Sequence, residues 1–209
     1  MKVIVMAKEP VPGRVKTRLC PPCSPAEAAS LAMAAIADTL DAALASGCDE
    51  VVLALDGQPG PWVPPRVRII AQVEGTFDHR LAAAWDAVGG PAVQIGMDTP
   101  QVTAPLLDSA MALLSTDGVD AVLGDALDGG WWIIGLRDAD AQVFADVAMS
   151  QSDTGARQRE RLATLGLTVA DVVPLTDVDT YDDAEAVAAL APTTRFARAL
   201  QLQQAAMNA

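Results

Sequence analysis

Four basic side chains are concentrated in one short segment of an acidic chain. The segment KEPVPGRVKTRL, residues 8–19, contains Lys8, Arg14, Lys16 and Arg18. The whole chain of 209 residues has 14 Lys and Arg against 27 Asp and Glu, which gives a formal net charge of −13. Because arginine offers forked hydrogen bonds and lysine a compact positive charge, this concentration of cations favours a phosphate-bearing ligand.

The simplest alternative for this segment is a solvated surface loop, which is what most runs of charge are. Two features favour anion binding instead. All three lysines of the chain lie within its first 16 residues, and Pro10, Pro12 and Gly13 stiffen or turn the segment. The segment matches neither the phosphate loop G-x-x-x-x-G-K-[ST] nor the dinucleotide motif G-x-G-x-x-G.

Acidic residues stand where a divalent metal would neutralise such a phosphate. Asp98 follows the apolar run AVQIG by two residues, and Pro100 stiffens the turn behind it. TDVDTYDD, residues 176–183, is a second source of carboxylates, although acidic residues after Asp-Thr are also a routine helix start. Since Mg²⁺ is commonly held by one or two carboxylates and substrate phosphates, Mg²⁺ or Mn²⁺ is the predicted cofactor.

The segment LDGGWW, residues 127–132, is a candidate contact for a sugar or an acceptor. Gly129 and Gly130 would let the backbone approach a ligand closely, and Trp131 or Trp132 could stack on it. A plain turn between strands and a core tryptophan are equally compatible with the pattern. If the reaction needs a general base, Asp128 is the candidate.

These segments lie between alternating strands and helices. Apolar runs predict strands over residues 2–7, 50–55, 67–72, 92–96, 121–124, 131–136 and 169–173. Helices are predicted over residues 25–46, 78–88, 104–115, 140–148, 155–165, 177–190 and 195–207. The first helix has the clearest start, because Ser24, Pro25 and Glu27 form a capping-box pattern.

This alternation predicts an α/β fold: a three-layer sandwich with a mostly parallel, Rossmann-like sheet, in a single domain over residues 1–209. Ligands of open α/β sheets bind at the carboxyl ends of the strands. The basic segment follows the first predicted strand, MDTP follows the fourth and DALDGG the fifth. The cations, Asp98 and Asp128 are therefore expected along one rim of the sheet.

The composition excludes several classes of partner. A strongly negative protein is a poor ligand for nucleic acid or for anionic membranes, which both attract positive surfaces. No uninterrupted apolar run approaches the roughly 20 residues of a membrane span, and the first run is too short for a signal peptide. We therefore expect a cytoplasmic protein. Three cysteines fit a reducing compartment, and CPPC at residues 20–23 is interpreted as two incidental thiols.

Four motifs occur in an order that resembles a known group of proteins. They are K-x-P-x-P-G-x-V-K-T-R-L from Lys8, G-M-D-T-P from Gly96, D-G-G-W-W-I-I-G-L from Asp128 and D-V-D-T-x-x-D from Asp177. Together they resemble a bacterial family of glycosyltransferase-like proteins with the glycosyltransferase-A fold, within the nucleotide-diphospho-sugar transferase superfamily. More distantly, the layout is similar to the molybdenum cofactor and phospholactate guanylyltransferases and to the sugar-acid cytidylyltransferases.

The resemblance implies a role for particular residues of this chain. The implied phosphate contacts are Lys8, Gly13, Lys16 and Arg18. Asp98 and Asp179 are implied as metal ligands, and residues 128–130 are implied to lie near the sugar or acceptor. Of the Leu-Gly-Glu-Arg stretch usual near the third strand, the chain keeps Gly75 and Arg80.

Two transferase chemistries would use such a site. In glycosyl transfer, an acceptor attacks the anomeric carbon of a nucleotide sugar and a nucleoside diphosphate leaves. In nucleotidyl transfer, an acceptor attacks the α-phosphorus of a nucleoside triphosphate and pyrophosphate leaves. The family favours glycosyl transfer, whereas the basic loop and the late DVDT segment resemble nucleotidyltransferases. A non-catalytic nucleotide-binding protein is the third alternative.

The expected partners follow from these chemistries. They are a nucleotide sugar or a nucleoside triphosphate, together with a small-molecule acceptor. The alanine-rich C-terminal helix, residues 195–207, is a candidate surface for a homodimer.

Overall fold

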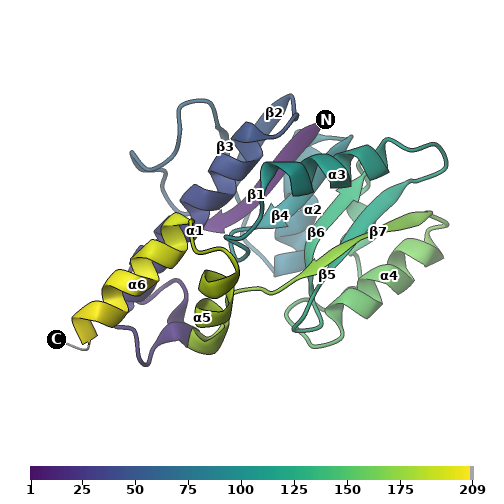
Figure 1. Cartoon of the computed structure of the whole chain (residues 1–209). Helices are drawn as coiled ribbons and strands as arrows, with labels where there is room; N and C mark the ends of the chain where they lie inside the picture. Colours follow the sequence, from purple (N-terminus) through teal and green to yellow (C-terminus); the bar gives the residue numbers. More distant parts are fainter. Residues whose placement is uncertain (208–209) are drawn as a thin grey trace.

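Seven strands form one mixed sheet, in the order β3-β2-β1-β4-β6-β5-β7, in the computed structural model, which describes residues 1–207 (Figure 1). The strands are β1 (Lys2–Lys8), β2 (Glu50–Asp56), β3 (Arg68–Ala71), β4 (Ala92–Gly96), β5 (Ala121–Ala126), β6 (Trp131–Leu136) and β7 (Val169–Leu175). Only β6 runs antiparallel to its neighbours, β4 and β5, because a tight turn joins it to β5. The predicted mostly parallel α/β sheet is confirmed.

Within residues 1–207, six α-helices and two short 3₁₀ turns accompany the sheet. They are η1 (Thr17–Leu19), α1 (Pro25–Ala45), α2 (Phe77–Val88), α3 (Ala104–Leu114), η2 (Ala141–Phe144), α4 (Thr154–Thr164), α5 (Tyr181–Leu190) and α6 (Arg195–Met207). The predicted capping box is confirmed: the Ser24 hydroxyl accepts from the Glu27 backbone N–H, and the Glu27 carboxylate accepts from Ser24 N–H.

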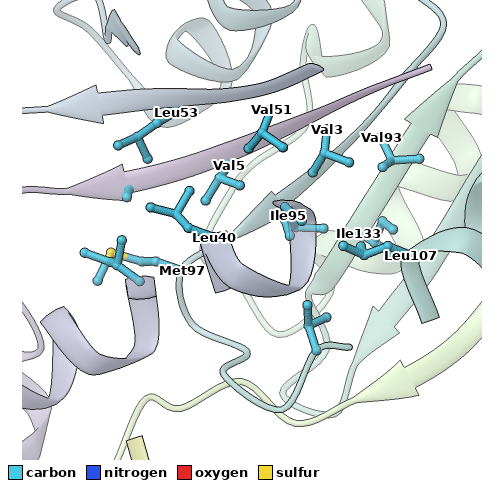
Figure 2. Packing of buried hydrophobic residues seen from close by; sticks show 14 of the residues in the cluster. Val3, Val5, Leu40, Val51, Leu53, Val93, Ile95, Met97, Leu107 and Ile133 are labelled. Carbon is cyan, nitrogen blue, oxygen red and sulfur yellow. The ribbon is translucent and has the colours of Figure 1, made fainter. Parts of the chain in front are cut away.

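Apolar side chains cover both faces of the sheet. On one face, α1 and α3 pack against alternate residues of the central strands, among them Val5 and Ile95 (Figure 2). On the other face, α2, η2 and α4 cover the remaining alternate residues, among them Ile4 and Ile134. Because the central strands are buried on both faces, they read as continuous apolar runs in the sequence.

A third apolar cluster lies on the outer side of α1, where α5 and α6 pack (Figure 1). Leu19, from the end of the basic segment, and Val178, from the acidic segment, are both fully buried in this cluster. Two segments some 160 residues apart in the sequence are therefore held together by apolar packing, and this packing positions the candidate site.

One predicted helix is wrong. Residues 140–148 form only the four-residue turn η2 and an irregular segment. Asp146 has a left-handed backbone (φ 63°), which a helix cannot continue through, and the Gln158 amide donates to the carbonyl of Val143 at 2.7 Å. The buried Val143 and Phe144 instead pack against α2, so tertiary contacts override the local helical pattern.

One helix also modifies the expectation about membrane spans. By length and composition alone, α1 is long and apolar enough to cross a membrane, with a mean hydropathy of 1.4 over its best window. Half of that window is buried inside the fold, against the sheet on one side and α6 on the other. The core helix of a soluble protein passes the same test, so the feature is weak evidence for a span.

Candidate functional site

The basic segment folds over the carboxyl ends of β1 and β4. Gly13 has a positive φ of 77°, and Lys16 adopts a left-handed conformation (φ 49°) just before η1. This conformation turns the Lys16 side chain inward, where only 7% of it is exposed. Its ammonium group contacts the carboxylate of Asp98 and donates to the carbonyl oxygen of Val178. A lysine predicted to bind phosphate thus forms an ion pair with a carboxylate predicted to bind metal.

The second cation of the segment makes a similar but more exposed pair. The Arg18 guanidinium donates to the carboxylate of Asp179 at 2.8 Å. Arg18 is 70% exposed and Asp179 42% exposed, so this pair contributes little to stability and separates easily. Lys8 and Arg14 are exposed, and they line the same cavity as Lys16 and Arg18.

Two hydrogen bonds, one between backbone groups and one from a side chain to the backbone, fix the acidic segment beside β4. The N–H of Val178 donates to the carbonyl oxygen of Asp98 at 2.8 Å, and the Gln101 amide donates to the carbonyl of Thr176 at 2.7 Å. Val178 itself is buried in the third apolar cluster. Its two neighbours, Asp177 and Asp179, therefore flank an anchored residue and stay close to Asp98.

Asp177 is the carboxylate that the sequence analysis did not assign. One of its oxygens, Oδ1, is shielded from solvent and has no hydrogen-bond partner. Burial, reinforced by the negative charges of Asp98 and Asp128, raises the pKa of Asp177 to about 8, although the Lys16 charge acts in the opposite direction. The alternation D-V-D, in which a buried apolar residue separates two acids, was the available signal that both carboxylates are held beside Asp98.

Two adjoining cavities open at this edge of the sheet. The first, of about 270 Å³, is lined by the basic segment together with Phe77, Asp98 and Asp179. The second, of about 630 Å³, extends toward α4 and includes Gln94, Trp131 and residues 149–152. Lys8, Arg18, Arg80, Asp98 and Asp179 line both cavities, so the two form one continuous site.

The LDGGWW segment contributes to the second cavity only in part. Asp128, Gly130, Trp131 and Trp132 line this cavity, and the Asp128 carboxylate accepts from Gly130 N–H at 2.9 Å. At Gly129 the group that comes close to the backbone belongs to the chain itself and not to a ligand. Gly129 has φ 93°, and its carbonyl accepts from Gly155 N–H at 2.8 Å at the start of α4. The predicted ligand contact of Gly129 stays a prediction.

This packing gives a stability prediction for Gly129→Ala. A Cβ at this position would lie 1.9 Å from the carbonyl oxygen of Ser152, and the backbone would have to move. We expect a loss of more than about 2 kcal/mol in the free energy of unfolding, measured by urea denaturation. Gly118→Ala is the matched control, because Gly118 has φ 81° with nothing within 4 Å, and should lose only about 1 kcal/mol. Equal losses in the two variants would mean that the positive φ alone, and not the contact with Ser152, sets the cost of the substitution.

The carboxylates fit a divalent metal in chemistry but not in their present spacing. Asp98, Asp177 and Asp179 offer only oxygen ligands, which Mg²⁺ and Mn²⁺ prefer, and Asp177 Oδ1 lacks any partner. Among residues 1–207, however, no three His, Cys, Asp or Glu side chains are grouped closely enough to hold an ion. Two of the carboxylates are instead paired with cations, Asp98 with Lys16 and Asp179 with Arg18.

Solved structures of other proteins share this fold. The chain has the nucleotide-diphospho-sugar transferase fold: it superposes with a TM-score of 0.87 on a crystal structure from Desulfovibrio desulfuricans G20 described as a candidate nucleotide-diphospho-sugar transferase. The two are 23% identical, over 98% of this chain and 95% of that one.

The chain belongs to the family described as "Uncharacterized protein conserved in bacteria" (DUF2064), whose profile matches residues 31–151. No curated protein matches it in sequence. The superposition on the Desulfovibrio structure confirms the fold that the motifs predicted.

Two more distant structures share the fold. CMP:2-keto-3-deoxy-manno-octonic acid synthetase in complex with CTP is 14% identical, with a TM-score of 0.57, over 91% of this chain and 97% of that one. Glucosyl-3-phosphoglycerate synthase from Mycobacterium tuberculosis, in complex with Mn²⁺, UDP and glucosyl-3-phosphoglycerate, is 12% identical, with a TM-score of 0.53, over 84% of this chain and 70% of that one. At these identities the similarity establishes the fold alone.

Proposed function

We propose that this protein is a metal-dependent transferase acting on a nucleotide substrate, and that the reaction is glycosyl transfer from a nucleotide sugar. The observation that carries the proposal is the pairing of Lys16 with Asp98 and of Arg18 with Asp179 at the carboxyl edge of the sheet. Cations that suit phosphate and carboxylates that suit a metal lie next to one another, and a metal–diphosphate ligand needs both kinds of group at one place.

The two ion pairs indicate how such a ligand would bind. The phosphate oxygens of a nucleoside diphosphate would bind Lys16 and Arg18, which then separate from Asp98 and Asp179. The metal that accompanies the diphosphate would bind the two carboxylates. Each charged group exchanges one partner for another, so none is left buried and unpaired. Metal and nucleotide should consequently strengthen each other's binding, and by the same factor.

In glycosyl transfer the bond between the anomeric carbon and the diphosphate breaks, and negative charge develops on the leaving nucleoside diphosphate. Lys16 and Arg18 are placed to stabilise that charge, and a metal held by Asp98, Asp177 and Asp179 would supply further electrostatic stabilisation. Asp128 lines the neighbouring cavity, where it can accept the proton of the acceptor hydroxyl as the new bond forms.

Nucleotidyl transfer is the second candidate, and one observation favours it. The carboxylates come from two different loops, Asp98 after β4 and the pair Asp177 and Asp179 after β7, instead of from one adjacent Asp-x-Asp after a central strand. In the nucleotidyltransferases that the sequence resembles, the metal ligands are expected at the same two positions, an Asp after the central strand and an Asp or Asn before a late helix. The complexes of the two distant structures, with CTP in one and with Mn²⁺ and UDP in the other, support both alternatives.

A ligand screen separates these reactions. Thermal melting of the full chain is measured with nucleoside triphosphates and with nucleotide sugars, each with Mg²⁺, with Mn²⁺ and with EDTA. A ligand at about 100 times its Kd should add roughly 2.7 kcal/mol of stability. Metal-dependent stabilisation by a nucleotide sugar supports glycosyl transfer. Stabilisation by a nucleoside triphosphate, with no response to any nucleotide sugar, favours nucleotidyl transfer.

Turnover of the stabilising ligand then distinguishes an enzyme from a binding protein. Nucleoside diphosphate released from a nucleotide sugar, or pyrophosphate released from a triphosphate, is measured with a mixture of small hydroxylated acceptors. Stabilisation without turnover favours the non-catalytic alternative. Absence of any metal-dependent shift would contradict the proposed function.

A further inference from the structure

One aromatic ring is exposed beside the cations of the basic segment. It belongs to Phe77, the first residue of α2, which is 39% exposed and lines both cavities. Several large apolar side chains are exposed in the described part of the chain, but Phe77 is the only aromatic one among them. It is also the only one of them that lines either cavity. Single exposed apolar side chains are normal on a surface, whereas an exposed ring inside a polar cavity indicates a ligand.

The ring of Phe77 is held in place by its own helix. Arg80, one turn further along α2, places its guanidinium carbon over the ring, 5.2 Å from the centroid. Nη1 of Arg80 donates to Asp56 at 3.1 Å and to Gln72 at 3.0 Å. The amide of Gln72 in turn donates to backbone carbonyls in β1 and β2. The ring is therefore tied to the sheet before any ligand arrives, and a ligand that stacks on it has little to reorganise.

The exposed ring and the phosphate-binding cations share the first cavity. This cavity is lined by all four cations of the basic segment, Lys8, Arg14, Lys16 and Arg18, and by Phe77. Its other apolar side chains are at most 5% exposed: Met6, Ala7, Val15 and Met97. A diphosphate bound to Lys16 and Arg18 would bring its nucleoside into the same cavity system. The ring of Phe77 is the one exposed flat apolar surface that the first cavity offers to that nucleoside.

We propose that Phe77 is the platform on which the base of the nucleotide substrate stacks, an inference that rests on the proposed nucleotide-dependent function. Every nucleobase has an aromatic face, and stacking on an aromatic side chain strengthens binding by roughly 5- to 150-fold per base. A phenyl ring offers no hydrogen bond, so it suits the flat face of a base better than a sugar, whose hydroxyl groups need partners. Trp131, which is only partly exposed, lines the second cavity alone and is separate from this platform.

The platform is tested by comparing ligands that have a base with one that has none. ADP, CDP, GDP, UDP and pyrophosphate are titrated calorimetrically, with Mg²⁺, into the full chain and into Phe77→Leu, which removes the ring but keeps an apolar side chain. We expect the variant to bind the preferred nucleoside diphosphate at least about tenfold more weakly than the wild type does. Its affinity for pyrophosphate should be unchanged, because pyrophosphate reaches only the cations and the metal.

Two further variants control for effects on the fold. Phe77→Tyr keeps the ring and should keep the wild-type affinity for every ligand. Leu113→Ala truncates an apolar side chain on α3 that is 37% exposed, close to the value for Phe77, and that lines neither cavity. It should also bind like the wild type. Thermal melting checks that each variant is folded.

A second measurement needs no variant to show the contact. In the complex of the wild-type chain with Mg²⁺ and the preferred nucleoside diphosphate, the ring protons of Phe77 should give nuclear Overhauser effects to the base protons. The base protons should also move upfield, because they would lie over the aromatic ring. Phe77→Leu removes both signals and so identifies them.

Four results would overturn the platform while nucleotide binding, and with it the proposed function, still stands. They are unchanged nucleotide affinity in Phe77→Leu, equal losses for nucleotide and pyrophosphate in that variant, wild-type binding of pyrophosphate as tight as that of every nucleoside diphosphate, and Overhauser effects from Phe77 to sugar protons only. A wild type that binds pyrophosphate and none of the four nucleoside diphosphates, or no ligand at all, would contradict the proposed function and the platform together.

Discussion

Asp98→Asn is expected to abolish metal-dependent nucleotide binding while the protein stays folded. The substitution keeps the shape of the side chain but removes the charge that faces Lys16 and the proposed metal. We expect a loss of at least about 100-fold in the apparent affinity for UDP or GDP with Mg²⁺, because a charged contact is worth about 1.5–3 kcal/mol and the metal is lost with it. Isothermal titration calorimetry in Mg²⁺ and in EDTA measures both affinities.

The control for this variant is Asp86→Asn, which makes the same charge change at an exposed position on α2. It should bind like the wild type. The EDTA titration is equally informative, because the wild type without metal should resemble Asp98→Asn with metal. Full metal-dependent affinity in Asp98→Asn would mean that the metal site lies elsewhere.

Asp177→Asn is expected to flatten the pH dependence of stability in the metal-free protein. The folded state holds the pKa of Asp177 at about 8, against about 3.9 in the unfolded chain. Between these two values the folded state binds a proton that the unfolded state does not, so wild-type stability falls as the pH rises from about 4 to about 8. The slope from this group is at most about 1.4 kcal/mol per pH unit.

The variant lacks this titration, so if the two proteins are nearly equal in stability at pH 5 in EDTA, the variant should be more stable than the wild type at pH 8 by about 3–4 kcal/mol. Urea denaturation across this pH range measures the difference. Asp182→Asn, an exposed acid at the start of α5, is the control and should keep the wild-type slope. An unchanged slope in Asp177→Asn would show that water already reaches the buried carboxylate oxygen.

The effects of Asp177→Asn on stability and on ligand binding should be opposite in sign. Asp177→Asn should stabilise the empty protein at neutral pH and weaken its response to Mg²⁺ with UDP or GDP. This opposition is expected when a buried carboxyl group serves a ligand and not the fold. Improved stability with unimpaired metal-dependent binding would assign Asp177 no part in the site.

Local patterns determined most of the fold. β4 and β6 begin and end where the sequence predicts. Each is a short apolar run with glycine and aspartate close to its ends, and this leaves little choice of where the strand starts and stops. The start of α1 follows from Ser24 and Glu27, whose side chains satisfy free N–H groups at the helix end. The predicted helix at residues 140–148 failed because its apolar residues serve the core without forming a helix.

The sequence by itself determined which chemistry could be present: cations after the first strand and acids after later strands, at the edge where parallel strands end. The tertiary structure alone decided which of these charges meet. Lys16 contacts Asp98 and Arg18 contacts Asp179 because Leu19 and Val178 are buried in one apolar cluster with α5 and α6. The buried oxygen of Asp177 likewise depends on packing between distant segments, which no local pattern records.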